Sequence, residues 1–419
     1  MLFHTIDYAA LLTVVWVFYW LAFRNRPTPA HLMLLVASYI FYCAWDWRFA
    51  GLLVFSTVLD FTLGKFIYEA TSLKKKRLLL FLSVIGNLSI LGFFKYYNFF
   101  LDSFNQIMTL LGLGPLEGSI EIILPLGISF YTFQTLSYTL DIYRRRLKPT
   151  TNLLHFALFV AFFPQLIAGP IVRARQFLPQ LQKGRSFNEE KIRSGLYRII
   201  KGLFKKIVLA DALGRLLVDP VFASTETVGG EAALLAMIGF HLQIGIDFSA
   251  YADIAIGSAR LLGFELPENF RAALRAVNLE DFWRRWHITL TTWLRDYVYL
   301  PLTIGSSSKG RPIRPYLSLV LTMGLVGLWH GANWTFVIFG LYHGIGLALT
   351  RFYRRNISPR TVSTPRSNVA GHATVWAKRI STQAVVALSV VLFRSADLQQ
   401  AKEIYLALLS PTNWGFHLD

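Results

Sequence analysis

Long apolar runs separated by short polar segments organise the chain from end to end. A backbone inside a bilayer must satisfy its own hydrogen bonds, so such runs predict helices, and the alternating strands of a membrane barrel are not found. We therefore expect an all-α, polytopic integral membrane protein. The runs lie at about 8–23, 31–45, 49–68, 78–94, 99–111, 122–140, 153–171, 199–218, 232–262, 283–304, 317–329, 334–350 and 383–393.

A helical crossing needs about 20 apolar residues, and several of these runs are shorter. We expect the short runs to tilt, to pair within one crossing, or to return to the same membrane face. Their lengths predict about ten or eleven transmembrane helices. No internal repeat and no large soluble insertion breaks the series, so residues 1–419 should form one membrane domain.

Two polar stretches differ from the rest. Between residues 165 and 215, charged side chains alternate with apolar ones, and this pattern predicts an amphipathic helical region on the cytosolic face near residues 180–206. Residues 356–368 are rich in Ser, Thr, Pro and Arg and should form a flexible loop.

Composition supports the bilayer as the solvent, since 54% of the 419 residues are hydrophobic and only 16% are charged. The formal net charge is +18, from 42 Lys and Arg against 24 Asp and Glu. These basic residues cluster between apolar runs, which is typical of the positive-inside rule and of contact with anionic lipid, not of nucleic-acid binding. As a secondary role, basic residues around a cytosolic opening would attract an anionic substrate such as an acyl-coenzyme A.

The ends of the first run and the single cysteine exclude several classes. No basic residue precedes the first run, which stops at Arg24 without a cleavage pattern, so we expect an uncleaved anchor with an extracytoplasmic N-terminus. Cys43 lies in an apolar run without a basic neighbour, which excludes a disulfide framework and disfavours thiol chemistry. No phosphate-binding loop, nucleophile elbow or zinc motif occurs, and no metal site is expected.

The first candidate for chemistry is the stretch 281–297, whose periodicity predicts one continuous helix. Trp283, Trp286 and His287 would share its apolar face, with Asp296 on the opposite face. A single histidine on an apolar face is most often a hydrogen-bonded core residue. This segment alone therefore predicts no activity.

The second candidate is His330, which ends an apolar run. An ionisable group inside a membrane span is costly and marks a functional site by default. Neutral imidazole accepts a proton near pH 7, as acyl transfer to a hydroxyl requires. Gly324, Gly327 and Gly331 share one helical side, where they would admit either another backbone or a thin substrate.

A transporter is the rival function. Asp247, Asp253 and His241 lie in an apolar run and could line an ion or proton path. The sequence has no matching pair of interrupted helices in two halves, which disfavours this interpretation.

Several stretches, in chain order, carry a family resemblance. They include Arg-Arg-Trp-His287 and Trp-His330-Gly, and together they lie at 125–134, 141–144, 163–170, 247–257, 267–270, 282–287, 293–299 and 328–334. In these stretches the chain resembles the membrane-bound O-acyltransferase (MBOAT) family, in its bacterial alginate O-acetyltransferase-like branch. The resemblance implies a ring of tilted helices around a transmembrane tunnel that joins a cytosolic donor to an outer acceptor.

The same resemblance implies roles for individual residues. His330 takes the catalytic position and His287 the second signature position. Tryptophans next to them would wall the tunnel and exclude water. The expected tunnel-lining or substrate-contacting residues are Trp286, Trp329, Trp334, Asn333, Gly327, Gly331 and Asp296.

Two features depart from the family pattern. Relatives commonly carry a Gly-Gly pair where this chain has Thr303 to Ser308, so the shape of that loop is not implied. The chain also stops at Asp419, earlier than many relatives, so we expect either that a terminal helix is absent or that the chain is a shortened form.

The expected reaction uses acetyl-coenzyme A as donor, with no tightly bound cofactor. His330 would act as general base on an acceptor hydroxyl, and His287, or a backbone amide near it, would polarise the carbonyl oxygen or orient the acceptor. The resemblance further implies the bacterial inner membrane and an extracytoplasmic SGNH-type acetyltransferase that modifies an exopolysaccharide or cell-wall glycan. The D-alanyl branch, which serves teichoic acids from a carrier protein, stays open as the alternative.

Overall fold

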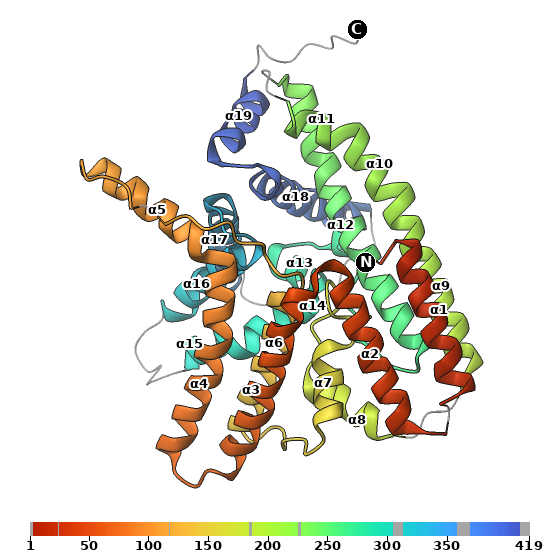
Figure 1. The fold of residues 1–419 in the computed structure, drawn as a ribbon. Coiled ribbons are helices and arrows are strands. Elements are labelled where there is room, and N and C mark those ends of the chain that lie inside the picture. Colours follow the sequence, from red (N-terminus) through yellow and green to blue (C-terminus); the bar gives the residue numbers. More distant parts are fainter. Residues whose placement is uncertain are drawn as a thin grey trace. The chain divides into compact units, whose positions relative to one another are not determined.

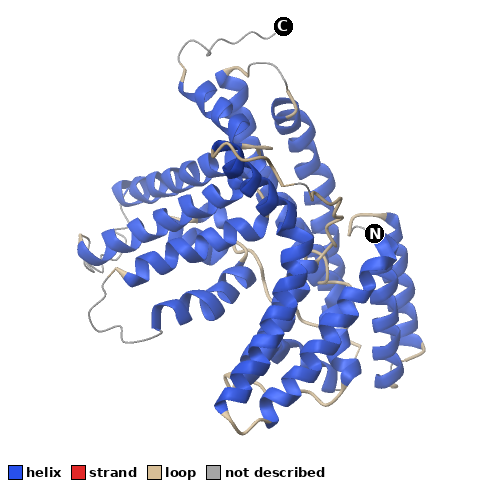
Figure 2. Cartoon of the chain, turned by 60° about the vertical axis from the view of Figure 1, so that its left-hand side comes forward, coloured by secondary structure: helices blue, strands red, loops and turns tan. Residues whose placement is uncertain are grey.

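The computed structural model describes residues 3–23, 25–116, 118–183, 187–224, 228–304, 313–357 and 369–410. Every regular element in these ranges is a helix, as Figure 2 shows. The all-α prediction is confirmed. Most of the loop expected at 356–368 lies outside the described residues.

Five helical stretches are long and apolar enough to cross a membrane: Pro27–Glu69, Leu73–Leu110, Gly230–Leu261, Trp334–Asn356 and His372–Arg394. They confirm a multi-pass membrane protein. The first stretch contains two helices of 20 residues each, α2 (Pro27–Asp46) and α3 (Ala50–Glu69), and each is long enough for one crossing. The expected count of ten or eleven crossings stays a prediction.

The contacts divide the chain into two compact units, of which the first comprises Met1–Leu203 and Tyr251–Glu268. Within it α3, α4 and α6 pack side by side (Figure 1). A buried carboxylate joins α3 to α4, because Asp60 accepts hydrogen bonds from Ser83 at 2.6 Å and from Asn87 at 2.7 Å. Besides α2 and α3, the unit holds α1 (Ile6–Leu21), α4 (Leu73–Leu91), a π-helix (Gly92–Tyr96), α5 (Tyr97–Leu110), α6 (Ile128–Tyr143), α7 (Leu153–Ala161), α8 (Ala174–Gln182), α9 (Glu189–Leu203) and the C-terminal part of α12 (Gly230–Leu261).

The amphipathic region expected near 180–206 contains α9. This helix packs closely on α12, since a Cβ atom on Gly195 would lie 2.9 Å from the carbonyl oxygen of Gly257. Its place on the cytosolic face stays a prediction.

The second unit comprises Phe204–Ala250 and Asn269–Asp419. Its α16 and α17 form a tight hairpin, because a Cβ atom on Gly327 would lie 2.0 Å from the Phe336 carbonyl oxygen and 3.0 Å from the Gly340 Cα. The unit contains π-helices Phe204–Ala210, Gly214–Val218 and Arg295–Tyr299, a 3-10 turn (Ala273–Arg275), the N-terminal part of α12, and α10 (Asp211–Leu213), α11 (Asp219–Phe222), α13 (Leu279–Arg285), α14 (Ile288–Leu294), α15 (Leu300–Ile304), α16 (Arg314–His330), α17 (Trp334–Asn356), α18 (Val369–Arg394) and α19 (Leu398–Leu409).

Two predicted helices are shorter than their apolar runs. In the run 122–140 the helix begins only at Ile128, after Gly127 adopts a left-handed backbone with φ 72°. In the run 153–171 the helix stops at Ala161, because Pro164 disfavours helical backbone at the residue before it.

Candidate functional site

The helix predicted over 281–297 is broken at its centre, so that prediction is wrong. His287 has a left-handed backbone, with φ 42° and ψ 53°, between α13 and α14. Asn269 supplies the physical reason. Its side-chain oxygen accepts from the Thr289 backbone N–H at 3.2 Å and from the Thr289 hydroxyl at 2.9 Å, while its carbonyl oxygen accepts from the Ile288 N–H at 2.9 Å. A residue far upstream thus starts α14 and interrupts the helix.

His287 is fully buried at this break. Its Nδ1 lies 3.2 Å from Oδ1 of Asn269, and its ring borders Phe248, Phe270 and Trp329 with centroid distances of 4.8, 6.4 and 5.9 Å. Burial lowers the pKa of this imidazole, which lies outside the five candidate spans. Nε2 has no hydrogen-bond partner within the described part of the chain.

His330 is the last residue of α16 and remains partly exposed. Its ring borders Trp329 at 4.8 Å, Phe393 at 4.9 Å and Phe339 at 6.0 Å between centroids. Trp329 also contacts His287. The structure therefore brings both expected histidines to the same indole.

Other expected site residues make packing and capping contacts. Trp286 stacks on Phe282 with centroids 5.6 Å apart. Asn333 caps α17, accepting from the Thr335 N–H at 3.0 Å and donating to the Ala396 carbonyl at 2.6 Å.

Three more expected site residues are Asp296, Gly331 and Trp334. Asp296 pairs with the adjacent Arg295 at 2.8 Å. A Cβ atom on Gly331 would lie 2.1 Å from the Phe336 ring, whereas Trp334, the first residue of α17, is 47% exposed. That these residues line a tunnel stays a prediction.

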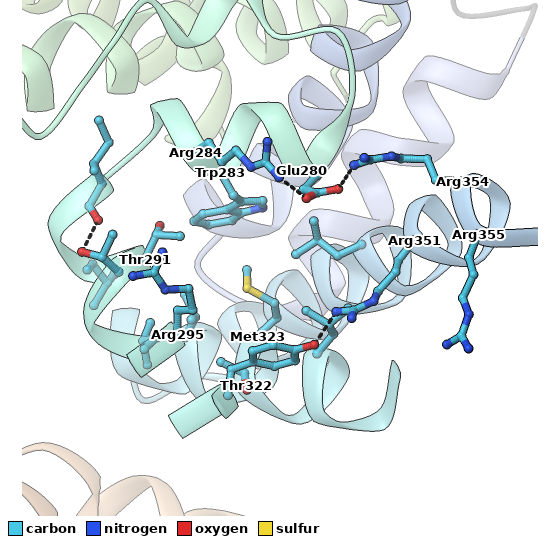
Figure 3. A pocket seen from close by; sticks show the side chains of 18 residues that line it. Glu280, Trp283, Arg284, Thr291, Arg295, Thr322, Met323, Arg351, Arg354 and Arg355 are labelled. Carbon is cyan, nitrogen blue, oxygen red and sulfur yellow. Dashed lines mark hydrogen bonds and ion pairs between the residues drawn. The ribbon is translucent and has the colours of Figure 1, made fainter. Parts of the chain in front are cut away.

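A cavity of about 1200 Å³ opens between α13, α14, α16 and α17 (Figure 3). Its charged lining is strongly basic, with five arginines against Glu280 alone. Arg284 and Arg354 both bind Glu280, and Arg351 donates to the Tyr299 hydroxyl. The arginines are Arg284, Arg295, Arg351, Arg354 and Arg355.

The remaining cavity wall is apolar or carries hydroxyl groups, and includes Trp283, Thr322 and Met323 (Figure 3). Two of its residues adjoin the histidines: Ile288 follows His287, and Val326 lies one helical turn before His330 on α16. None of the nine expected site residues is itself part of the lining. The cavity thus reaches the neighbourhood of both histidines.

Sequence reasoning missed the cavity arginines and Asn269. Arg351, Arg354 and Arg355 share one helix face at offsets of three and four, but the basic clusters are assigned mainly to the positive-inside rule and lipid contact, with attraction of an acyl-coenzyme A as a secondary use. Asn269 lies in the matched stretch 267–270, but its role depends on His287, 18 positions away.

The polar residues of the rival ion path are each bound to another side chain. These contacts link elements of the fold, so they do not by themselves favour an ion path over acyl transfer. The pairs are Asp247 with Lys206 at 3.0 Å, Asp253 with Arg198 at 2.9 Å, and His241 with Gln383 at 3.0 Å.

Known proteins are similar to most of the chain. A protein of Azotobacter vinelandii named "Probable alginate O-acetylase AlgI" is 40% identical over 385 residues, which cover 92% of this chain and 73% of the relative. The peptidoglycan O-acetyltransferase of Helicobacter pylori is 35% identical over 409 residues, covering 91% and 74%. The teichoic acid D-alanyltransferase of Bacillus subtilis is 29% identical over 238 residues, covering 55% and 60%.

The family sequence model for membrane-bound O-acyltransferases matches residues 128–386. This range includes both histidines, Asn269 and every residue of the cavity lining. The chain therefore belongs to the membrane-bound O-acyltransferase family and is an acyltransferase embedded in a membrane.

Proposed function

We propose that the chain moves an acetyl group from cytosolic acetyl-coenzyme A toward a hydroxyl acceptor used for O-acetylation of an extracytoplasmic polysaccharide or cell-wall glycan. The observation that carries this proposal is the arginine-lined cavity whose wall ends one helical turn from His330. An anionic thioester suits such a cavity, because its phosphates need cations and its acyl end needs a wall that excludes water.

The α16–α17 hairpin separates a donor end from an acceptor end. The positive-inside rule assigns the end of α17 that carries Arg351, Arg354 and Arg355 to the cytosol. His330 lies at the opposite end of this hairpin, and the 23 residues of α17 extend over about 35 Å. Guanidinium groups bind phosphates in a bidentate geometry, which supports a nucleotide-bearing donor at the cytosolic end.

The proposed step is acyl transfer with His330 as general base. Its imidazole takes the proton from the acceptor hydroxyl while the hydroxyl oxygen bonds to the thioester carbonyl carbon. The carbon–sulfur bond then breaks, and the leaving thiolate takes the proton from the imidazolium. Such proton transfer contributes about 10²–10⁴-fold in rate. Trp286, Trp329 and Trp334 would exclude water, which otherwise hydrolyses the donor.

The acceptor and the location rest on the relatives. Two of them carry names that refer to O-acetylation of alginate and of peptidoglycan, polymers found outside the cytoplasm. The proposed location is the bacterial inner membrane, with an extracytoplasmic N-terminus. The proposed partner is an extracytoplasmic SGNH-type acetyltransferase that receives the acetyl group.

D-alanyl transfer to teichoic acid is the second candidate, supported by the Bacillus relative. Its donor would be a carrier protein's phosphopantetheine arm. The lower identity and the smaller share of the chain that this relative covers favour acetyl transfer. A neighbouring carrier-protein and D-alanine ligase gene would support D-alanylation, and a neighbouring SGNH gene would support acetylation.

The test uses the purified protein in nanodiscs with labelled acetyl-coenzyme A and the proposed SGNH-type partner. We expect transfer of label, and a loss of about 10²-fold or more in His330→Ala with an unchanged unfolding temperature. His155→Ala is the matched control, because His155 is another partly exposed histidine and its ring contacts the imidazole ring of His31. Near-normal transfer in His330→Ala contradicts the proposal, and solute uptake without acyl transfer supports the transporter.

A further inference from the structure

The hydrogen bonds around Asn269 determine which nitrogen of His287 carries the proton. The Thr289 backbone N–H can only donate, so the atom of Asn269 that faces it at 3.2 Å must be the oxygen. A flipped amide would place two donors against each other. The same oxygen lies 3.2 Å from Nδ1 of His287, so this nitrogen carries the hydrogen and donates.

The second nitrogen of His287 therefore has a lone pair and no hydrogen. It is buried and has no hydrogen-bond partner in the ranges that the structure describes. A buried acceptor without a partner is unfavourable, so a hydrogen-bond donor supplied by a ligand would stabilise Nε2.

A second buried histidine shows the contrast. His343 accepts from the Trp283 indole N–H through Nδ1 at 3.3 Å, so its Nε2 carries the hydrogen and donates to the Ser389 hydroxyl at 2.9 Å. Both of its nitrogens are used in joining helices. His287 has the opposite tautomer, with one nitrogen left for a ligand.

We propose that Asn269 is a positioning residue that fixes His287 in the Nδ1–H tautomer, so that Nε2 accepts a hydrogen bond from a hydroxyl or N–H group of the acyl acceptor other than the reacting hydroxyl. This inference rests on the proposed function and deepens it. Polarising the thioester carbonyl would require a hydrogen on Nε2, and the tautomer excludes this. Of the two roles expected for His287, orienting the acceptor remains, while His330 takes the proton of the reacting hydroxyl.

The residues around His287 favour a neutral imidazole that accepts a hydrogen bond. From α12 it meets Phe248, from the segment after Glu268 it meets Phe270, and from α16 it meets Trp329, none of which titrates near neutral pH.

Charged and titratable groups on the packed elements have their own contacts. His330 lies beyond Trp329 and contacts that indole. Near these elements Asp247 pairs with Lys206, Arg284 with Glu280 and Arg285 with Asp281, while Arg271, next to Phe270, is exposed.

The first test replaces the amide while keeping its acceptor. Asn269→Asp still accepts from His287 and Thr289, but its negative charge should raise the pKa of His287 by about 1–3. Protonation of Nε2 removes the lone pair. In a plot of kcat against pH, the fall in kcat on the acid side should therefore move to higher pH by the same amount. Asn269→Leu removes the acceptor and should lower kcat by about 10²-fold, with little change in the KM for acetyl-coenzyme A.

Thr289→Val is the matched control. It removes another hydrogen bond to the same Asn269 oxygen and leaves the one from His287, so the pH profile should stay in place. If Asn269 had only a structural role, Asn269→Asp and Asn269→Leu would lower stability, and the pH at which kcat falls in acid would not change.

A spectroscopic measurement tests the tautomer without activity. In the full chain labelled with ¹⁵N-histidine, the resonance that disappears in His287→Gln should show a protonated Nδ1 and a bare Nε2. The opposite tautomer, or an unchanged pH for the fall of kcat in acid in Asn269→Asp, overturns the inference even if Asn269→Leu fails to fold. Absence of acetyl transfer in the unmodified protein instead contradicts the proposed function, and the resonance still reports the tautomer.

Discussion

Trp283 donates its indole N–H to Nδ1 of His343 across 3.3 Å, and this bond ties α13 to α17. The other nitrogen of His343 bonds Ser389 on α18. Because Trp283 lines the cavity, the chain of two hydrogen bonds ties this wall to α17, which also lines the cavity, and to α18, whose described residues do not. A buried ionisable residue in a membrane span, often a sign of chemistry, serves here to join helices.

Replacing His343 with alanine should therefore reduce stability more than chemistry. The substitution leaves the Trp283 N–H and the Ser389 hydroxyl without this partner, which should cost about 2–4 kcal/mol. Because Trp283 loses its anchor, the KM for the donor should rise while kcat changes little. Thermal unfolding and steady-state kinetics in nanodiscs measure both effects. A kcat loss as large as that of His330→Ala, at unchanged KM, would show that His343 takes part in the reaction.

Arg355→Gln should weaken donor binding about tenfold, the contribution of one charge-assisted hydrogen bond to a phosphate. The effect should appear in the KM for acetyl-coenzyme A and not in kcat. The KM for S-acetyl-N-acetylcysteamine, a thioester without phosphates, should not change. Arg193→Gln is the control, since Arg193 forms an exposed ion pair on α9, outside the cavity. Equal effects on both thioesters would contradict the assignment of the arginines to the donor's phosphates.

Gly327→Val should disrupt the α16–α17 hairpin, because a Cβ atom at this position would lie 2.0 Å from the Phe336 carbonyl oxygen. We expect a lower unfolding temperature and a loss of folded protein in detergent. Gly51→Ala is the matched control, since a Cβ atom there has no neighbour within 4 Å. If Gly327→Val unfolded normally but lost activity, Gly327 would line the acyl path and not the helix contact.

Glu268→Gln should destabilise the first unit, where Arg198 binds both Glu268 and Asp253. Removing the charge should cost about 1–2 kcal/mol. The Arg198 guanidinium holds the pKa of the Glu268 carboxyl below its usual range. The stabilisation is therefore present above the unfolded pKa and is lost as pH falls through the lower folded value.

Unfolding temperatures of both proteins measured between pH 7 and pH 3 check this linkage. The difference in unfolding temperature between wild type and Glu268→Gln should be largest near neutral pH and should disappear in acid. A constant difference would show that Glu268 contributes through packing alone.

Much of the fold could be predicted from the sequence because it follows from local patterns. The apolar run at 334–350 lies within α17, and the run at 232–262 corresponds closely to α12. Helix formation in a bilayer depends on the hydrophobicity of the segment itself, and this property can be read directly from the sequence. The stretches around His287 and His330 likewise pointed to the family.

The tertiary structure alone decided how the candidate site is built. Periodicity favoured a helix through His287, but Asn269, 18 positions earlier, breaks it by capping α14. The sequence also presents His287 and His343 as equivalent histidines in apolar surroundings. Their hydrogen-bond partners come from distant segments and give them opposite tautomers, because a neutral imidazole places its single proton according to the groups that face it.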